Sequence, residues 1–274
     1  MLKKSDFVLL SFFVTVGLYL YYYYFLISDL PVWVNDLKAC GSVMELGSFI
    51  KGHLNIFAYL FITGVMTFFI LKTIYKFFIN LKEYFRLQKY IKKHTIKRYK
   101  NLRIIDTKDN IAFSFGIFKT GIALSKNLFK NFSKKEIKNI YLHEKGHLLN
   151  GDSYKLFIFS ILANLFPSKL RDKLIKDFSL LKEVEADDYC SEKTDKIQLA
   201  QTILKFYSVQ ANLHIPMMNS YIETRIKFLT EELNYKKINP QNVYFTFLAL
   251  LIFFLLLSYL FQYCLCGMSS FMSF

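Results

Sequence analysis

A His-Glu-x-x-His motif at residues 143–147 carries the clearest chemical signal in this 274-residue chain. Residues four apart on an α-helix lie on one face, so His143 and His147 can direct two imidazoles at one metal ion. Zinc accepts that geometry, and Glu144, one step round the helix, can reach a water at the metal and act as general base. The motif therefore predicts one Zn²⁺ per chain and a hydrolytic site with Glu144 as the catalytic residue.

A zinc site with two histidines needs a third protein ligand and an open position for water. An acidic cluster later in the chain contains Glu183 and Asp187, which are four residues apart and can both face the motif helix. One of them would bind the metal, and the other would orient a histidine N–H from behind. An ordinary solvent-exposed acidic face is the alternative, and it is the favoured interpretation for Glu185 and Asp188.

The composition indicates a membrane protein. Hydrophobic residues make up 53% of the chain while the formal net charge is +15, a combination that is unusual for a soluble domain. Uncharged stretches predict spans at about residues 7–27 and 54–79, joined by a short outer loop at 28–52. A further uncharged stretch predicts a C-terminal transmembrane helix within 241–274. We therefore expect a mainly α-helical, multi-pass integral membrane protein with a small β element.

Nine Lys or Arg residues and a single acid lie between Lys82 and Arg103, directly after the second predicted span. By the positive-inside rule, this basic run places the N-terminus and the residues after about 80 in the cytoplasm, and the C-terminus outside. Contact with an anionic lipid bilayer is the favoured role of the basic run, rather than direct binding of nucleic acid.

Residues 80–240 are expected to form the zinc-binding domain. Patterns of apolar residues and turn residues predict short strands at 103–106, 111–115 and 116–124. Ser133 begins a helix with a capping box to Glu136, and Gly151 ends that helix. The motif histidines therefore lie on a helix with well-defined ends.

The apolar segment at 155–167 is too short to cross a bilayer. If it crossed, Glu183 would lie on the opposite side from His143 and His147, because no later apolar run brings the chain back. Given a shared metal, we expect this segment to be a short membrane-associated helix that is either re-entrant or buried. The metal site is then cytoplasmic, at or just below the membrane surface.

These features resemble the BlaR/MecR-type (antirepressor) membrane zinc metallopeptidases, which are zincin-like. The resemblance covers about residues 100–230 and is carried by Ala112–Lys119, Ile122–Ser125, Leu128, His143-Glu144-x-x-His147, Gly151-Asp152, Asn164-x-x-Pro167 and Glu183-x-x-Ala186-Asp187. The HtpX-like and CAAX-type membrane proteases are similar in the motif and the acidic cluster. The resemblance implies a zincin-like (HExxH) cytoplasmic metalloprotease domain between transmembrane helices, in a bacterial-type inner membrane.

The resemblance also implies roles for individual residues. His143, His147 and Glu183 would be the zinc ligands, with Asp187 supporting them from behind. Glu144 would activate the water and then pass a proton to the leaving amine.

Two further sets of residues are candidates, the first from the resemblance and the second from the predicted strand pattern. His214 and Arg225 loosely resemble an element of the CAAX-type relatives in which the histidine helps to stabilise the oxyanion and the arginine supports the site. The alternative is that both residues cap or neutralise helix ends. The strand with Ala112, Phe113 and Ser114 would be a sheet edge that pairs with an extended substrate.

The favoured function is a zinc-dependent integral-membrane endopeptidase that hydrolyses peptide bonds at the cytoplasmic membrane face. Its substrate would be a protein or peptide, with a cytoplasmic repressor or a membrane protein as candidates in regulatory signalling. The alternative is a non-catalytic membrane signal transducer or scaffold that retains the metallopeptidase fold. A disulfide from Cys40 to Cys264 or Cys266 is a further hypothesis, and free thiols are the favoured interpretation.

Overall fold

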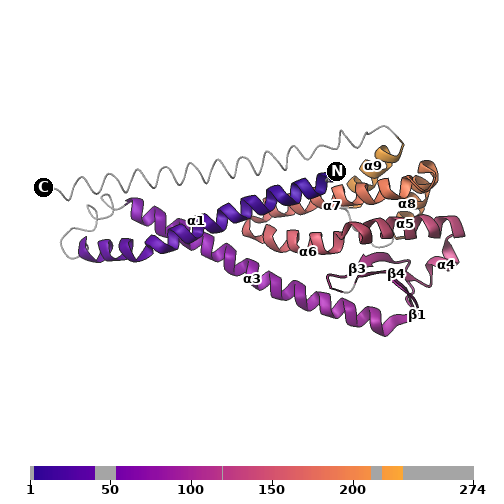
Figure 1. Cartoon of the computed structure of the whole chain (residues 1–274), viewed down its shortest axis with the longest axis horizontal. Coiled ribbons are helices and arrows are strands. Elements are labelled where there is room, and N and C mark those ends of the chain that lie inside the picture. Colours follow the sequence, from indigo (N-terminus) through magenta and orange to yellow (C-terminus); the bar gives the residue numbers. More distant parts are fainter. Residues whose placement is uncertain (1–2, 41–53, 119, 211–217, 231–274) are drawn as a thin grey trace.

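The computed structural model describes residues 3–40, 54–118, 120–210 and 218–230 (Figure 1). Within these ranges the chain is mostly helical with one small four-stranded sheet, which confirms the expected mainly α protein with a small β element. The predicted C-terminal span, His214, Cys264 and Cys266 lie outside the described residues.

Two long apolar helices cross each other at one end of the molecule (Figure 1). They are α1, Lys4–Cys40, and α3, Leu54–His94. Lys4–Pro31 and Leu60–His94 are long and apolar enough to cross a membrane. Only 33% and 17% of their apolar windows are buried, whereas the core helix of a soluble protein is mostly buried. Both helices therefore fit transmembrane segments.

Both helices extend further than the sequence predicts. The first continues into the predicted loop at 28–52 as far as Cys40, and the second continues past residue 79 to His94. The helices are longer than the predicted spans because charged residues end an apolar stretch without ending a helix. Lys, Arg, Glu and Gln are good helix formers, and they dominate the last turns of α3. Pro31 lies inside α1, a position that helices in membranes tolerate.

The four strands form a sheet in the order β1-β2-β4-β3. They are β1 Thr95–Tyr99, β2 Leu102–Ile105, β3 Ala112–Phe115 and β4 Gly121–Ser125. The pair β2–β4 is parallel, and the other two pairs are antiparallel. Strand β3 is an edge of this sheet, as predicted. Strand β1 was missed because its residues fall in the basic run, and β4 begins five residues later than the predicted strand at 116.

Helix α5, Lys134–Asn150, follows the short helix α4, Leu128–Asn131, and has the predicted ends. The Ser133 N–H donates to Glu136 Oε2 at 2.7 Å, and the Glu136 N–H donates to Ser133 Oγ at 3.3 Å, which completes the capping box. Gly151 has φ 67°, a left-handed conformation that glycine adopts without strain and that ends helices.

The segment predicted at 155–167 is packed among other helices. It comprises most of α6, Asp152–Leu162, and the 3₁₀ turn η1, Ala163–Leu165. Phe159 of α6 stacks between Phe12 of α1 and Phe178 of α7, with ring centroids 4.3 Å apart in both cases. The chain then reverses, and α7, Ser168–Ser191, returns alongside α5 (Figure 1). This reversal is what a metal shared between α5 and Glu183 requires.

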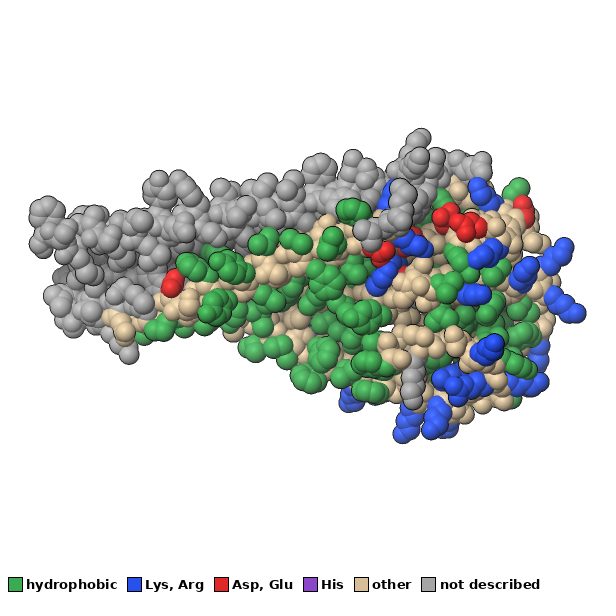
Figure 2. Space-filling view, viewed as in Figure 1, with side chains coloured by type: hydrophobic (Ala, Val, Ile, Leu, Met, Phe, Trp, Pro, Cys, Tyr) green, Lys and Arg blue, Asp and Glu red, His purple; other side chains and the backbone are tan. Residues whose placement is uncertain are grey.

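Helices α5 and α7 approach each other closely at Gly146. A Cβ atom at this glycine would lie 3.2 Å from Ala186 Cα, so a larger residue would push the two helices apart. Helices α8, Lys196–Gln210, and α9, Met218–Leu229, cover the same end of the pair. In the view of Figure 2, apolar side chains cover the middle of the molecule, and Lys and Arg gather at the end that holds the sheet.

Candidate metal centre

The three predicted ligands meet where α5 lies against α7. The Nε2 atoms of His143 and His147 are 3.1 Å apart. Glu183 Oε2 is 3.4 Å from His143 Nε2, and its Oε1 is 3.5 Å from His147 Nε2. A tetrahedral zinc ion with bonds of about 2.0–2.1 Å separates its ligand atoms by about 3.3–3.4 Å. The donor types and their spacing therefore fit one zinc ion.

The other ring nitrogen of each histidine faces a buried carboxylate. His143 Nδ1 is 2.8 Å from Asp187 Oδ1, and His147 Nδ1 is 2.8 Å from Asp152 Oδ2. This arrangement fixes each ring and its tautomer and leaves Nε2 free for a metal. Asp187 thus occupies the supporting place predicted for it, and Asp152 does the same for the second histidine.

Carboxylates dominate the electrostatics of both rings. Burial, and to a smaller extent Arg225, would lower the pKa of His143, but Asp187 and Glu183 together outweigh them and raise that pKa above its ordinary value. For His147, burial is again outweighed, here by Glu183 and Asp152, and the pKa is raised well above the ordinary range. The site therefore attracts cations, protons and metal ions alike, and a metal must displace protons to bind.

Arg225 of α9 balances the acids on one side of the site. Its Nε and Nη2 atoms donate to the two oxygens of Asp187 at 2.6 and 2.8 Å, and its Nη1 is 2.8 Å from Glu183 Oε2. Burial would raise the pKa values of Glu183 and Asp187, but the charge of Arg225 and the contacts with the two histidines together outweigh it and lower both. The arginine, 3% exposed, therefore lies where a residue that supports the site would be expected, and this role stays a prediction.

A cavity of about 240 Å³ opens beside the ligands. Glu144, 8% exposed, lines it together with His143 and Glu183. Tyr207 of α8 lines it too, and its hydroxyl oxygen accepts a hydrogen bond from Arg225 Nη1 at 3.1 Å. Because that oxygen is already an acceptor, the O–H proton of Tyr207 is available to a group in the cavity.

Edge strand β3 borders the same cavity through Ala112. Ser125 N–H donates to the carbonyl of Ile111 at 2.8 Å, so residues 111 and 113 direct their main-chain groups to β4. Ala112 and Ser114 therefore direct theirs to the free edge, where the Ser114 carbonyl already accepts from Ser153 Oγ at 3.3 Å. Ala112 is the candidate whose main-chain groups stand open beside the metal ligands.

The expectation for Glu185 was wrong. Its side chain is 3% exposed and accepts hydrogen bonds from the N–H and the hydroxyl of Ser5, at 3.1 and 2.7 Å. Glu185 lies on the face of α7 that packs against α1. The sequence pattern of α7 did not show that another helix covers this face. Asp188, by contrast, is exposed, as expected.

Four residues near the site were missed by sequence reasoning: Ser5, Asp152, Lys182 and Tyr207. A signal existed for Asp152 alone, since an acid directly after the glycine that ends α5 lies one turn beyond His147. The contacts that bring the others to the site join residues far apart in the chain: Tyr207 and Arg225 are 18 apart, and Ser5 and Lys182 are 177 apart.

The comparisons with known proteins bear on the same residues. The family model described as BlaR1 peptidase M56 matches residues 47–167, which include α3, the sheet and the His-Glu-x-x-His motif but not Glu183. Protease HtpX of Wigglesworthia glossinidia brevipalpis is 30% identical over 99 residues. That alignment spans 34% of this chain and 34% of the relative.

Apolar helices that fit a membrane, together with a His-His-Glu metal site, define the class of the membrane metallopeptidases. Both comparisons fall in that class, and they confirm the resemblance to BlaR1-type and HtpX-type membrane metallopeptidases.

Proposed function

We propose that this protein is a zinc-dependent integral-membrane endopeptidase. The observation that carries the proposal is the ligand triangle of His143, His147 and Glu183, with both Nδ1 atoms held by carboxylates and Glu144 in the adjoining cavity. The complete donor set is the reason to prefer an enzyme over a transducer or scaffold that only retains the fold.

When bound, zinc supplies a Lewis acid and lowers the pKa of a coordinated water toward neutrality. Glu144 accepts the proton of the attacking water and later donates it to the nitrogen of the leaving amine. Tyr207 donates its O–H to the oxygen on which negative charge develops. Arg225 holds Asp187 and Glu183 in place and so keeps His143 oriented.

The substrate would bind as an extended segment along the edge of β3. The free main-chain groups of Ala112 would pair with it and place the scissile bond over the cavity. The main-chain groups of Phe113 pair with Ala123 of β4, so they would keep the strand in register and would not pair with the substrate.

The location of the site follows from the charge pattern. We infer a transmembrane hairpin at 1–79, a metallopeptidase domain at 80–240 and a C-terminal transmembrane helix at 241–274. The basic run after the second span supports a cytoplasmic active site beside an anionic bilayer. A cytoplasmic repressor or a membrane protein is the proposed class of substrate.

The test is a Glu144→Gln variant, with the exposed Glu192→Gln as its control. We expect Glu144→Gln to bind zinc as the wild type does and to lose cleavage by at least about 100-fold, since general-base catalysis contributes that much or more. Proteomic comparison of cells with each variant for peptides with new N-termini gives the readout and names the substrate. Cleavage retained in Glu144→Gln would remove this residue from the mechanism.

A further inference from the structure

A buried polar network connects the first turn of α1 to the metal centre. Asp152 contacts His147 through one oxygen and forms an ion pair with Lys182 through the other, with Lys182 Nζ 3.0 Å from Asp152 Oδ1. Lys182 Nζ also donates to Ser5 Oγ at 2.6 Å and lies 3.3 Å from Glu185 Oε2. The network therefore runs from a main-chain segment of α1 to a metal ligand through three side chains.

The ammonium group of Lys182 is surrounded by oxygens in this network, and its contact with Asp152 Oδ1 is an ion pair without hydrogen-bond geometry. The ammonium group carries three protons and faces three oxygens, those of Asp152, Ser5 and Glu185. Lys182 and Ser5 are 0% exposed, and Asp152 is 1% exposed. Charge-assisted contacts that water cannot reach are stronger than exposed ones and are screened little by salt. Loss of any one oxygen would shift the ammonium group and, with it, Asp152.

The contact with α1 depends on where that helix begins. The Ser5 N–H is one of the first four of α1, which have no partner within the helix, and it donates to Glu185 Oε1 at 3.1 Å. A carboxylate at this end also interacts favourably with the helix dipole. Lys3 and Asp6 add contacts to Asn150 and Lys155. An axial or rotational shift of α1 would break these contacts together.

We propose that Ser5 and Lys182 are positioning residues of the metal centre, through which the first turn of α1 sets the metal affinity of His147. The proposal rests on the zinc site proposed above. Lys182 fixes Asp152, Asp152 fixes the His147 ring, and Ser5 fixes Lys182. Because α1 fits a transmembrane segment, a displacement of α1 in the membrane would reach a metal ligand by this route.

Zinc affinity of the full chain in detergent, measured by competition with a chromophoric chelator, tests the proposal. Ser5→Ala should weaken zinc binding by about threefold to tenfold, below the effect of losing a direct partner of a ligand. The control is Thr15→Val, because Thr15 also has a buried hydroxyl on α1 but donates it to Ser11 of its own helix. The zinc affinity of this control should stay within about twofold of that of the wild type, a change well below the loss expected when a residue that orients a ligand is removed.

A second measurement separates positioning from mere structural support. Coupling between two sites is reciprocal, so zinc should slow hydrogen exchange of the first-turn amides of α1 in the wild type and fail to do so in Ser5→Ala. Equal zinc affinity and equal exchange in both proteins would overturn the positioning role while the metal site stands. A wild type that binds no zinc would overturn the proposed function and this inference with it.

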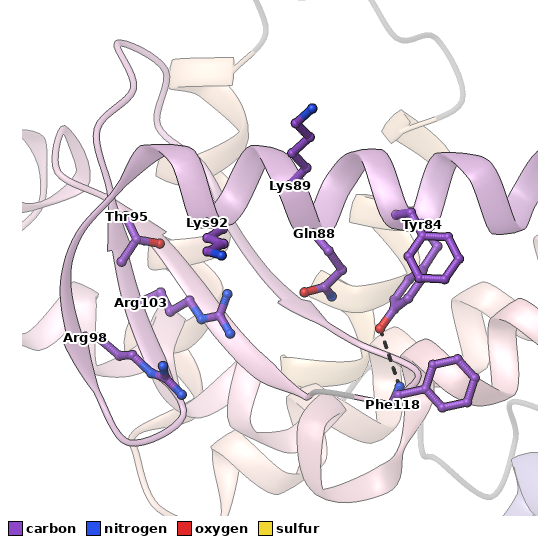
Figure 3. A pocket seen from close by; sticks show the side chains of 9 residues that line it. Tyr84, Gln88, Lys89, Lys92, Thr95, Arg98, Arg103 and Phe118 are labelled. Carbon is purple, nitrogen blue, oxygen red and sulfur yellow. Dashed lines mark hydrogen bonds between the residues drawn. The ribbon is translucent and has the colours of Figure 1, made fainter.

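A second cavity, of about 720 Å³, lies between the last turns of α3 and the sheet (Figure 3). Lys92, Arg98 and Arg103 line it, with no carboxylate among the lining residues. Among the described residues none of these three cations forms an ion pair, and Arg103 lies over the ring of Phe115 at 4.9 Å. The Nε2 atom of Gln88 is buried there without a hydrogen-bond partner. The cavity thus offers several free donors to an anion.

The cavity has an apolar end as well as a basic end. Figure 3 shows Tyr84 and Phe118 at one end, joined by a hydrogen bond from the Phe118 N–H, and the basic residues at the other. The apolar end points back along α3, where Phe78 is 62% exposed and lies on the same helix face as the lining residue Phe85, seven residues further on. This order of an aromatic surface and then a basic cavity matches an amphiphile whose chains lie along a membrane helix and whose head is anionic.

We propose that this cavity binds the phosphate headgroup of an anionic phospholipid, with the acyl chains against α3. The guanidinium groups of Arg98 and Arg103 would hold the phosphate oxygens, and Gln88 would supply a neutral donor. The aromatic end distinguishes this ligand from a free phosphate ion.

Native mass spectrometry of the full chain in detergent with phosphatidylglycerol or phosphatidylcholine tests this site. We expect phosphatidylglycerol to be preferred, and Arg98→Gln/Arg103→Gln to weaken its binding by about tenfold or more. Arg86→Gln/Lys93→Gln removes the same charge from exposed positions that do not line the cavity and should change binding little. No preference for the anionic lipid, an equal loss in the control, or equally tight binding of glycerol 3-phosphate would each overturn the assignment.

Discussion

The two histidines of the metal centre are held by two unlike networks. On the His143 side, Asp187 accepts a bidentate pair of hydrogen bonds from the guanidinium group of Arg225, which also lines the cavity beside the ligands. On the His147 side, Asp152 is held by the ammonium group of a lysine that is sealed from solvent. Both networks follow the same plan, in which a histidine is supported by an acid and the acid by a cation.

The two networks differ in the other residues that each cation contacts. Arg225 contacts Glu183, a predicted zinc ligand, and Tyr207 of α8. All three residues line the cavity, so a molecule that enters it would contact the His143 side. Lys182 contacts Ser5 of α1, so the geometry of the His147 side depends on the position of a helix that fits a membrane span. One half of the site therefore borders the cavity that would take the proposed substrate, and the other half contacts a helix that fits a transmembrane segment.

The largest effect is expected from removing either cation. Arg225→Met and Lys182→Met should each cost about 3–5 kcal/mol of stability, because the first leaves buried Asp187 without its cation and the second does the same to buried Asp152 and Glu185. Zinc should recover more of this loss in Arg225→Met, since the metal neutralises Glu183 but contacts neither acid beside Lys182. Thermal unfolding with and without zinc gives the comparison, and equal recovery in both variants would show that the two sides do not differ in this way.

Asparagine variants of the two supporting acids sharpen the comparison at the metal itself. Asp187→Asn and Asp152→Asn should each weaken zinc binding by about 10–100-fold, the usual effect of losing a group that orients a ligand. The loss should be larger for Asp187→Asn, because Arg225 also loses its bidentate partner. Chelator competition measures both affinities, and a value within twofold of the wild type in either variant would contradict the supporting role.

The smallest effect on stability is expected at the start of α5, which is part of neither the His143 network nor the His147 network. Burial would raise the pKa of Glu136, but hydrogen bonds from Ser133 and Lys205 outweigh it and lower that pKa below its model-compound value of 4.5. A lowered carboxyl pKa means stability that is present above about pH 4.5 and is lost as the pH falls through the folded-state value.

Glu136→Gln tests this point. The variant should cost about 0.5 kcal/mol at pH 7, since glutamine keeps the capping box and only an exposed ion pair is lost. The cost should vanish at low pH, and zinc affinity should not change. Thermal unfolding across pH measures the stability cost. A stability difference from the wild type that persists at low pH would contradict the lowered pKa.

Much of the site could be predicted from the sequence because its signals are local. The spacing of His143 and His147 places two imidazoles on one face, and Ser133 and Gly151 mark the ends of their helix. The four-residue spacing of Glu183 and Asp187 placed both acids toward that helix, and the structure brings both to the histidines.

The residues that hold Asp152 on the His147 side could not be predicted, because they depend on tertiary contacts. Ser5 lies 180 residues from Glu185, and nothing in either segment points to the other. Strand β1 was missed for a different reason, since its lysine and arginine side chains point to solvent and hide the strand in a charged run. Charge also concealed that α3 continues as one helix as far as His94.

The zinc content of purified protein tests the central claim most directly. Wild type and the control Glu192→Ala should each hold one zinc ion per chain after purification in zinc-buffered solution, and Glu183→Ala should hold far less, because it removes one of three ligands. A wild type without stoichiometric zinc, or a Glu183→Ala protein that keeps it, would contradict a metal centre built from His143, His147 and Glu183.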